Sequence, residues 1–366
     1  MSLSPTLSRR DFLTAAGAAA LATSLPSLMR AQAPQTTAVA LVGAAHIHTP
    51  GYIKALKGRS DVRVKAVWDY DPARAAKAAS DLGSKAVASV EQIWSDSEIK
   101  AVVICSETNR HHDLVIAGAQ AGKHLYVEKP LGINGKESLE MAKAIEEAKV
   151  LFTTGYFMRC DPKHLFLKKE VAAGNLGIIT RVRASNCHGG SLAGYFDTDY
   201  RWMADPKIAG VGAFGDLGTH KLDILMWIFG GLDSGTATLR TVTNRYPGCD
   251  ETGEALLKFK NGIIGTLGAG WVDVDDPVKL LISGTEGHAV IVNNQLYYTS
   301  KRTGSKGKEP YPELPAGPQV PIQQFFAALA GAKDQPLVPP GEAAARVVAM
   351  EALYASASEG KWVPIG

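Results

Sequence analysis

The sequence predicts an α/β protein whose first half is a doubly wound parallel sheet and whose second half is an α+β domain with a largely antiparallel or mixed open sheet. Two observations predict this fold class. In the first half, short apolar runs alternate with helical stretches, at the spacing of repeated strand–helix–strand units. In the second half, segments of alternating apolar and polar residues follow one another through short turns, which is typical of antiparallel strands.

The apolar runs of the first half are largely continuous, as expected for strands that helices cover on both faces. In chain order, the expected strands are residues 39–42, 62–68, 101–105, 124–127 and 151–154. The helices expected around them are residues 50–57, 72–82, 90–94, 114–121 and 135–149. This order predicts a nucleotide-binding domain over residues 36–155, whose ligand binds at the carboxyl ends of the strands.

The second half, residues 156–366, has a different pattern. Its expected helices are residues 166–173, 219–228, 321–330 and 342–359. Its expected strands are residues 181–186, 253–259, 263–269, 278–283 and 288–292. A Lys260-Asn261-Gly262 turn joins two of these strands. We therefore expect an α+β substrate and oligomerisation domain, with C-terminal helices that can pack back on the first domain.

The composition is that of an ordinary globular protein. The chain has 366 residues, of which 46% are hydrophobic and 20% charged, and this length suits about two domains. A net charge of only +3 gives no strong field for nucleic acid, so no nucleic-acid partner is expected. The four cysteines show no CxxC or CxxH spacing, which argues against a zinc site or a redox dithiol.

The first 33 residues have the pattern of an export signal. A twin-arginine segment, Ser8-Arg9-Arg10-Asp11-Phe12-Leu13, precedes an apolar stretch at residues 14–28, and Ala31-Gln32-Ala33 fits a small-x-small cleavage site. A retained membrane anchor is the competing interpretation, but the stretch is short and rich in alanine. We expect residues 1–33 to be removed, which leaves a periplasmic or otherwise exported protein without stable membrane insertion.

A modified nucleotide-binding turn follows the first expected strand. Such a turn usually reads GxGxxG, but only Gly43 is kept, and Ala45 and His48 occupy the places of the other two glycines. Asp69 ends the second strand, where a carboxylate can bind both ribose hydroxyls of the adenosine and repel a 2′-phosphate. The cofactor is therefore expected to be NAD rather than NADP, unless Asp69 only begins a turn and caps the next helix. His46 and His48 form an HxH pair, but no acidic third ligand is evident, so no metal is expected.

Three further segments carry the chemistry. Glu128-Lys129-Pro130 follows the fourth expected strand, residues 156–159 (Tyr-Phe-Met-Arg) follow the fifth, and an Asp216-x-x-x-His220 motif opens a helix. With these motifs the chain resembles the Gfo/Idh/MocA family, named after glucose–fructose oxidoreductase, inositol dehydrogenase and a rhizopine-catabolism protein. The resemblance covers nearly everything after the signal. The other matching segments are Thr108-Asn109 with His112, Ala121-Gly122-Lys123-His124 and Tyr200-Arg201-Trp202.

The resemblance implies an NAD(P)-dependent oxidoreductase that acts on the CH–OH group of a sugar, a sugar alcohol or a related polyol. Oxidation of a secondary alcohol requires a hydride acceptor and a base for the hydroxyl proton. The Lys129 ammonium can stabilise the developing alkoxide, and His220 is a natural acid–base group. Asp216 lies four residues before His220 and can share its helix face. The matching lysine and histidine are the family's usual catalytic pair, and which of them takes the proton stays open.

The expected contacts fall into two groups. Cofactor contacts are expected from Gly43, Ala45, His46, Asp69, Ser106, Thr108, Asn109, His112 and Glu128. Substrate contacts are expected from Arg159, His188, Tyr195, Tyr200, Arg201 and Trp202, because aromatic faces and hydrogen-bond donors suit a polyhydroxylated ring.

Two other functions are compatible with the same motifs. Some members of this family, also with twin-arginine signals, oxidise a sugar at C3 transiently with bound NAD and thereby cleave a glycosidic bond. A non-catalytic sugar-binding relative is the second alternative, which the altered glycine loop favours and the Lys129, Asp216 and His220 motifs oppose. The expected partners are a small sugar or polyol and further copies of the chain, as a dimer or tetramer.

Overall fold

A computed structural model describes residues 36–366, and the proposed signal lies outside them. The first domain holds the expected parallel sheet, which has five expected strands and the additional short strand β3, in the order β3-β2-β1-β4-β5-β6. Its strands are β1 (Thr37–Val42), β2 (Val62–Trp68), β3 (Lys85–Ala86), β4 (Ile99–Ile104), β5 (His124–Val127) and β6 (Phe152–Thr154). Because β1 pairs with both β2 and β4, the strand order reverses at β1, which is where doubly wound sheets bind their ligands.

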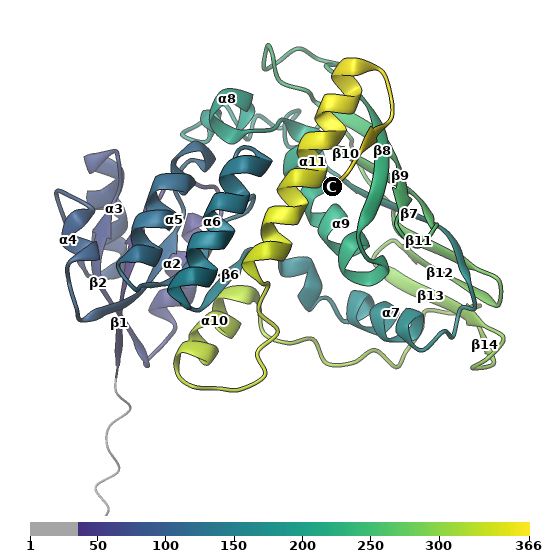
Figure 1. Cartoon of the computed structure of the whole chain (residues 1–366), viewed down its shortest axis with the longest axis horizontal. Coiled ribbons are helices and arrows are strands. Elements are labelled where there is room, and N and C mark those ends of the chain that lie inside the picture. The colour runs from purple at the N-terminus through teal and green to yellow at the C-terminus, as the bar shows by residue number, and fades with distance from the viewer. Residues whose placement is uncertain (1–35) are drawn as a thin grey trace, which may run out of the picture. The chain divides into compact units, whose positions relative to one another are not determined.

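Helices cover both faces of this sheet (Figure 1). They are α2 (Thr49–Lys57), α3 (Pro72–Leu82), α4 (Glu91–Trp94), α5 (His111–Gln120) and α6 (Gly135–Ala148). Ala40 and Val42 of β1 belong to a core with residues of α5 and α6, whereas Val39 and Leu41 belong to a core with residues of α2 and α3. Successive strand residues point to opposite faces, so β1 has to be apolar at nearly every position.

The second sheet has nine strands in the order β14-β13-β12-β11-β7-β10-β9-β8-β15. Their bounds are β7 (Ile179–Cys187), β8 (Leu232–Arg240), β9 (Thr252–Phe259), β10 (Ile264–Gly270), β11 (Val278–Gly284), β12 (Gly287–Val292), β13 (Gln295–Ser300), β14 (Ser305–Lys306) and β15 (Val363–Pro364). Strands β7 and β10 are parallel and the other neighbours are antiparallel, which confirms the expected mixed sheet. Helices α7 (Pro162–Ala172) and α9 (Ala213–Phe229) lie along one side of it (Figure 1).

The C-terminal helices join the two domains. Phe325 and Phe326 of α10 (Pro321–Leu329) pack into the core beneath α2 and α3. Helix α11 (Pro340–Glu359) contributes Val347 to the core of the first domain, and Met350 and Leu353 to the core of the second. Figure 1 shows α11, in yellow, crossing between α6 and the strands of the second sheet. Within residues 36–366, no helix is both long and apolar enough to cross a membrane.

Helix α9 begins at Ala213, six residues before the expected range 219–228, and thus includes the Asp216-x-x-x-His220 motif expected to open it. Gly215 and Gly218 are weak helix formers and hid this beginning in the sequence. A Cβ on Gly218 would lie 3.2 Å from the Met350 side chain, so this glycine lets α11 approach closely. The early start places Asp216 in the first turn of α9.

Candidate active site

The loop after β1 turns on Gly43. Its φ is +80°, and a Cβ at this position would lie 2.5 Å from the backbone nitrogen of Ser106, so only glycine fits without displacement. Its N–H donates to the carbonyl oxygen of Trp68 at 2.7 Å, and the N–H of Ala44 donates to Asp69 Oδ2 at 2.6 Å. The loop is therefore fixed beside the ends of β2 and β4, although two of the usual three glycines are absent.

Asp69 is buried at the carboxyl end of β2 and is paired with an arginine. Its Oδ1 accepts from the N–H of Asp71 at 2.7 Å and from Arg74 Nη2 at 2.8 Å. The same Arg74 nitrogen donates to Glu107 Oε1 at 2.7 Å. This guanidinium partly neutralises the Asp69 carboxylate, so the charge at the end of β2 is that of the Asp69–Arg74 pair and not of the carboxylate alone.

Lys129 and Asp216 form a buried ion pair between the domains. Lys129 Nζ donates to Asp216 Oδ1 at 2.9 Å, and the indole N–H of Trp271 donates to Asp216 Oδ2 at 3.1 Å. Burial would raise the pKa of Asp216, but the charge and hydrogen bond of Lys129 outweigh it and lower the pKa to about 2. The carboxylate is thus ionised and holds the ammonium in place.

His220 lies one helical turn after Asp216 and is buried beside aromatic rings. The centroid of its ring is 4.9 Å from that of Phe157 and 6.3 Å from that of Tyr156. Burial, together with the positive charge of Lys129, holds the pKa of His220 well below its usual range, so the imidazole is neutral. Its Nδ1 has no hydrogen-bond partner within residues 36–366. Asp216 therefore orients Lys129, and the imidazole keeps its capacity for a ligand.

These groups share one cavity of about 290 Å³, which we call the catalytic cavity. The first domain contributes Ile47, His48 and Lys129. The second contributes Phe157, Met158, Asn186, His188, Tyr195, Phe196, Met203, Asp216, Leu217 and His220. An ammonium, a carboxylate and a neutral imidazole thus surround a space bordered by apolar side chains, which suits binding and deprotonation of an alcohol.

Glu128 is fully buried directly before Lys129 and links the motif to the cofactor loop. His48 Nδ1 lies 3.1 Å from Glu128 Oε1, and the Tyr52 hydroxyl donates to Glu128 Oε2. Burial alone would raise the pKa of Glu128, but the nearby charges of His46, His48 and Lys129 outweigh it and hold this pKa well below its usual range. The carboxylate therefore stays ionised and fixes the orientation of the modified loop.

Glu128 is also the acidic neighbour that the sequence did not reveal for the two histidines. Ligand atoms of His46, His48 and Glu128 lie within 4.8 Å of one another, so together they could hold a metal ion. However, both Glu128 oxygens already accept hydrogen bonds, and His46 Nδ1 already accepts from the N–H of His48 at 3.2 Å. These hydrogen bonds hold the three side chains without an ion, and the absence of a metal stays a prediction.

The other expected cofactor residues lie in different surroundings. Thr108 is buried at the start of the turn η1 (Thr108–Arg110) after β4, and the neighbouring Asn109 has a buried Oδ1 with no hydrogen-bond partner in the described part of the chain. The Ser106 hydroxyl donates to the carbonyl oxygen of Glu107 at 3.3 Å. His112 lies on the surface of α5, between Asp113 and Glu140, and not beside the loop.

Of the expected substrate residues, His188 and Tyr195 lie in the catalytic cavity. Tyr200 instead lines a cleft of about 480 Å³ between α2 and α3. The indole N–H of Trp202 donates to the carbonyl oxygen of Ala45 at 3.1 Å, and the guanidinium of Arg201 lies 4.5 Å from the centre of the Tyr246 ring. Trp202 therefore supports the cofactor loop from the second domain, and Arg201 packs within the second domain.

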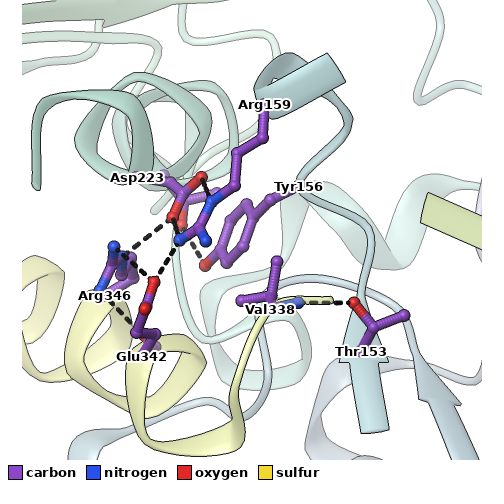
Figure 2. A network of polar contacts seen from close by, with 8 residues as sticks. Thr153, Tyr156, Arg159, Asp223, Val338, Glu342 and Arg346 are labelled. Carbon is purple, nitrogen blue, oxygen red and sulfur yellow. Dashed lines mark hydrogen bonds and ion pairs between the residues drawn. The ribbon is translucent and has the colours of Figure 1, made fainter. Parts of the chain in front are cut away.

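Arg159 takes part in an ion-pair network that Figure 2 shows from close by. Its Nε donates to Asp223 Oδ2 at 2.8 Å, and its Nη2 donates to Glu342 Oε2 at 2.7 Å. Arg346 of α11 donates to Asp223 Oδ1 at 3.0 Å. Asp223 is completely buried, so its charge has to be compensated by these two guanidiniums. In the structure Arg159 therefore ties α9 to α11 and does not line the catalytic cavity, contrary to the substrate contact expected from the sequence.

Several site residues had no signal in the sequence. Trp271 directly follows β10. Its indole contacts Asp216, which lies 55 positions earlier in the chain. Asn186 enters the cavity from the end of β7, and Phe196 enters it from the irregular segment that follows this strand. For Tyr52 a weak signal exists, because it lies one helical turn after His48 at the beginning of α2.

Two family models match adjoining parts of the chain. The model described as the oxidoreductase family with the NAD-binding Rossmann fold, of GFO_IDH_MocA, matches residues 37–156. The model of the GFO/IDH/MocA C-terminal domain matches residues 164–290. Together the two matches span well over half of the chain and meet near the boundary between the two sheets.

Individual proteins resemble the chain more distantly. Levoglucosan dehydrogenase of Pseudarthrobacter phenanthrenivorans is 30% identical over 224 residues, which cover 61% of this chain and 56% of that protein. Inositol 2-dehydrogenase of Rhizobium meliloti is 29% identical over 195 residues, or 53% of this chain and 56% of that protein. The chain thus matches little more than half the length of these relatives. The solved structure of levoglucosan dehydrogenase with NADH and levoglucosan has a TM-score of 0.73 at 23% identity, covering 90% of this chain and 100% of that one, which shows a common fold.

Proposed function

Because the chain belongs to the Gfo/Idh/MocA family of oxidoreductases, we propose that it oxidises a CH–OH group of a sugar, a sugar alcohol or a related polyol, with NAD as the hydride acceptor. The observation that carries this proposal is that Lys129 of the first domain and Asp216 and His220 of the second line one cavity. The two relatives named above are dehydrogenases of levoglucosan and inositol, which supports a polyhydroxylated substrate.

The residues present fit a dinucleotide. The Gly43 turn packs so closely on the backbone of Ser106 that a Cβ would clash, and it precedes the N-terminus of α2, where phosphate groups bind favourably. The Asp69–Arg74 pair lies at the end of β2, where the adenosine ribose binds in such folds. When NAD is bound, its nicotinamide supplies the hydride acceptor.

The ionisation states of Lys129 and His220 indicate different roles for the two residues in the reaction. Lys129 is paired with Asp216, so its ammonium is held to donate a hydrogen bond to the reacting oxygen and to stabilise the alkoxide. His220 is neutral, so its ring can accept the hydroxyl proton. As the substrate C–H bond gives up its hydride, the O–H proton passes to the imidazole, and a carbonyl remains beside Lys129.

The test measures NADH formation by absorbance with a panel of sugars, polyols and sugar acids. We expect turnover with at least one of them, and its near loss in His220→Ala with NAD affinity unchanged. His112→Ala is the matched control, because this histidine lies on the surface of α5. Release of an aglycone from a glycoside without net NADH would instead identify the glycosidase with transient C3 oxidation. Sugar binding without either reaction would support the non-catalytic alternative.

We also propose that the protein is exported through the twin-arginine route. Support comes from the Arg9-Arg10 pair, the apolar stretch at residues 14–28 and the Ala31-Gln32-Ala33 site. A mature chain beginning near Pro34 in the periplasm is the expected result of N-terminal sequencing from the native host. Unchanged export of an Arg9→Lys/Arg10→Lys double variant would contradict it.

Self-association is a further part of the proposed function. Exposed apolar residues lie on strands of the second sheet, among them Leu256, Ile264 and Val278, which are 40%, 55% and 47% exposed. A sheet face of this kind is buried favourably against another copy. Light scattering of the purified chain should give a dimer or tetramer, and Ile264→Glu should reduce the assembly. A monomer at all concentrations would contradict the proposal.

A further inference from the structure

A second cavity, of about 430 Å³, adjoins the catalytic cavity. It lies between α7, α9 and the strands β11 and β12. Phe157, Met158 and Asn186 line both cavities. The two cavities are thus direct neighbours that meet at these three residues. We call this second space the Lys221 cavity, after the residue that follows His220 in α9.

Lys221 is the unusual feature of this cavity. The residue as a whole is 2% exposed, and no ion pair or hydrogen bond of its ammonium occurs within residues 36–366. Its Nζ is not fully enclosed, so it faces the space of the cavity. Burial lowers the pKa of Lys221 to about 8, so the group still carries its charge near neutral pH. A buried ammonium without a counter-ion is costly, and such a group is usually paired.

The other charged groups of the cavity do not compensate Lys221. Lys163 lies 3.1 Å from Asp161 Oδ1, and that oxygen also accepts the N–H of Lys163 at the start of α7. Lys279 lies 2.9 Å from Asp276 Oδ2, an oxygen that also accepts from the N–H of Cys187. Asp161 is thus paired with Lys163, and Asp276 is paired with Lys279. The positive charge of Lys221 is left without a paired carboxylate among these groups.

A neutral acceptor accompanies this charge. His164 Nδ1 lies 2.9 Å from the carbonyl oxygen of Met158, which makes it the donor, and burial lowers the pKa of His164 to about 4. Its Nε2 is therefore an acceptor, and it is buried with no hydrogen-bond partner within the described residues. Asn186 donates its amide to the carbonyl oxygen of Leu217 at 2.9 Å, which leaves its own oxygen as an acceptor. The Asn186 oxygen suits a ligand hydroxyl directly, whereas His164 Nε2 is enclosed and would need a small movement of the ring to accept from one.

We propose that the Lys221 cavity binds the carboxylate of an acidic sugar, with Lys221 as its counter-ion and with His164 and Asn186 accepting from neighbouring hydroxyls. A single uncompensated charge matches a monoanion, such as the carboxylate of a uronic or aldonic acid, better than a doubly charged phosphate. This inference rests on the proposed function, because it assigns the substrate class of the same site. It makes Lys221 a specificity-determining residue rather than a catalytic one.

The test compares D-glucuronate with D-glucose, in equilibrium binding and in turnover, on the NAD-loaded protein. A charge-assisted hydrogen bond contributes about 1.5–3 kcal/mol, so Lys221→Gln should weaken glucuronate binding at least tenfold and leave glucose binding unchanged. Lys207→Gln is the matched control, because Lys207 is exposed on α8 (Pro206–Ala209). Equal effects of Lys221→Gln on both sugars would overturn the proposal, and so would a preference for D-glucose 6-phosphate over glucuronate.

A stability measurement keeps the test informative if the variant binds poorly for other reasons. Lys221→Met removes an uncompensated buried charge, so its melting temperature should equal or exceed that of the native protein. A clear decrease would show that Lys221 is structural and would contradict the proposal. Lys221-dependent binding of glucuronate without any NADH formation would keep the subsite but reject the proposed oxidation, which separates the two failures.

Discussion

Replacing Lys129 by methionine removes the cation beside Asp216 and keeps most of the side-chain volume. Lys129 Nζ is 2.9 Å from Asp216 Oδ1, and the two side chains are 3% and 15% exposed, so solvent screens the pair little. Removal of one partner of a buried ion pair destabilises a protein by about 3–5 kcal/mol. Loss of a positioned catalytic group lowers a rate by about 10²–10⁴-fold. We expect both losses in Lys129→Met.

The assays are urea unfolding followed by tryptophan fluorescence, and NADH formation at saturating NAD. A Lys129→Met/Asp216→Asn double variant removes both charges and should regain part of the stability but none of the turnover, because coupled neighbours are not additive. Native Asp216 has its pKa lowered to about 2, so its stabilising contribution is present above the ordinary value of 3.8 and is lost as pH falls towards 2. Additive destabilisation in the double variant, or turnover within tenfold of the native protein in Lys129→Met, would refute this reasoning.

Three further predictions concern the cofactor loop and the base. Asp69→Ala should narrow the preference for NAD over NADP, because Arg74 becomes free to pair with a 2′-phosphate. Nucleotide titrations that give an unchanged ratio of the NAD and NADP affinities would contradict this prediction. Gly43→Ala should abolish nucleotide binding in calorimetry, since its Cβ would meet Ser106 at 2.5 Å in a left-handed backbone conformation, and retained affinity would count against the loop assignment. Because burial lowers the pKa of His220 well below 6.5, the acid limb of the kcat/KM profile should lie below pH 6.5, and an acid limb above that value would reject His220 as the base.

The sequence by itself predicted the architecture of two sheets and the candidate catalytic residues. Continuous apolar strands and the Gly43 turn are local patterns, because each depends on a few neighbouring residues. The helical spacing of Asp216 and His220 is local as well. The place of Lys129 at the site can be predicted from its position directly after a strand, since the carboxyl ends of parallel strands share one edge of the sheet.

Only the tertiary structure decided which of the remaining polar residues meet. Glu128 reaches His48 from 80 positions away, and Arg159 pairs with Asp223 rather than with the catalytic cavity. Lys221 follows His220 immediately, yet its side chain lines the neighbouring cavity, and no ion pair of its ammonium occurs within the described residues. Such contacts depend on how two sheets and α11 pack together, and a pattern of neighbouring residues carries no information about partners so far apart in the chain.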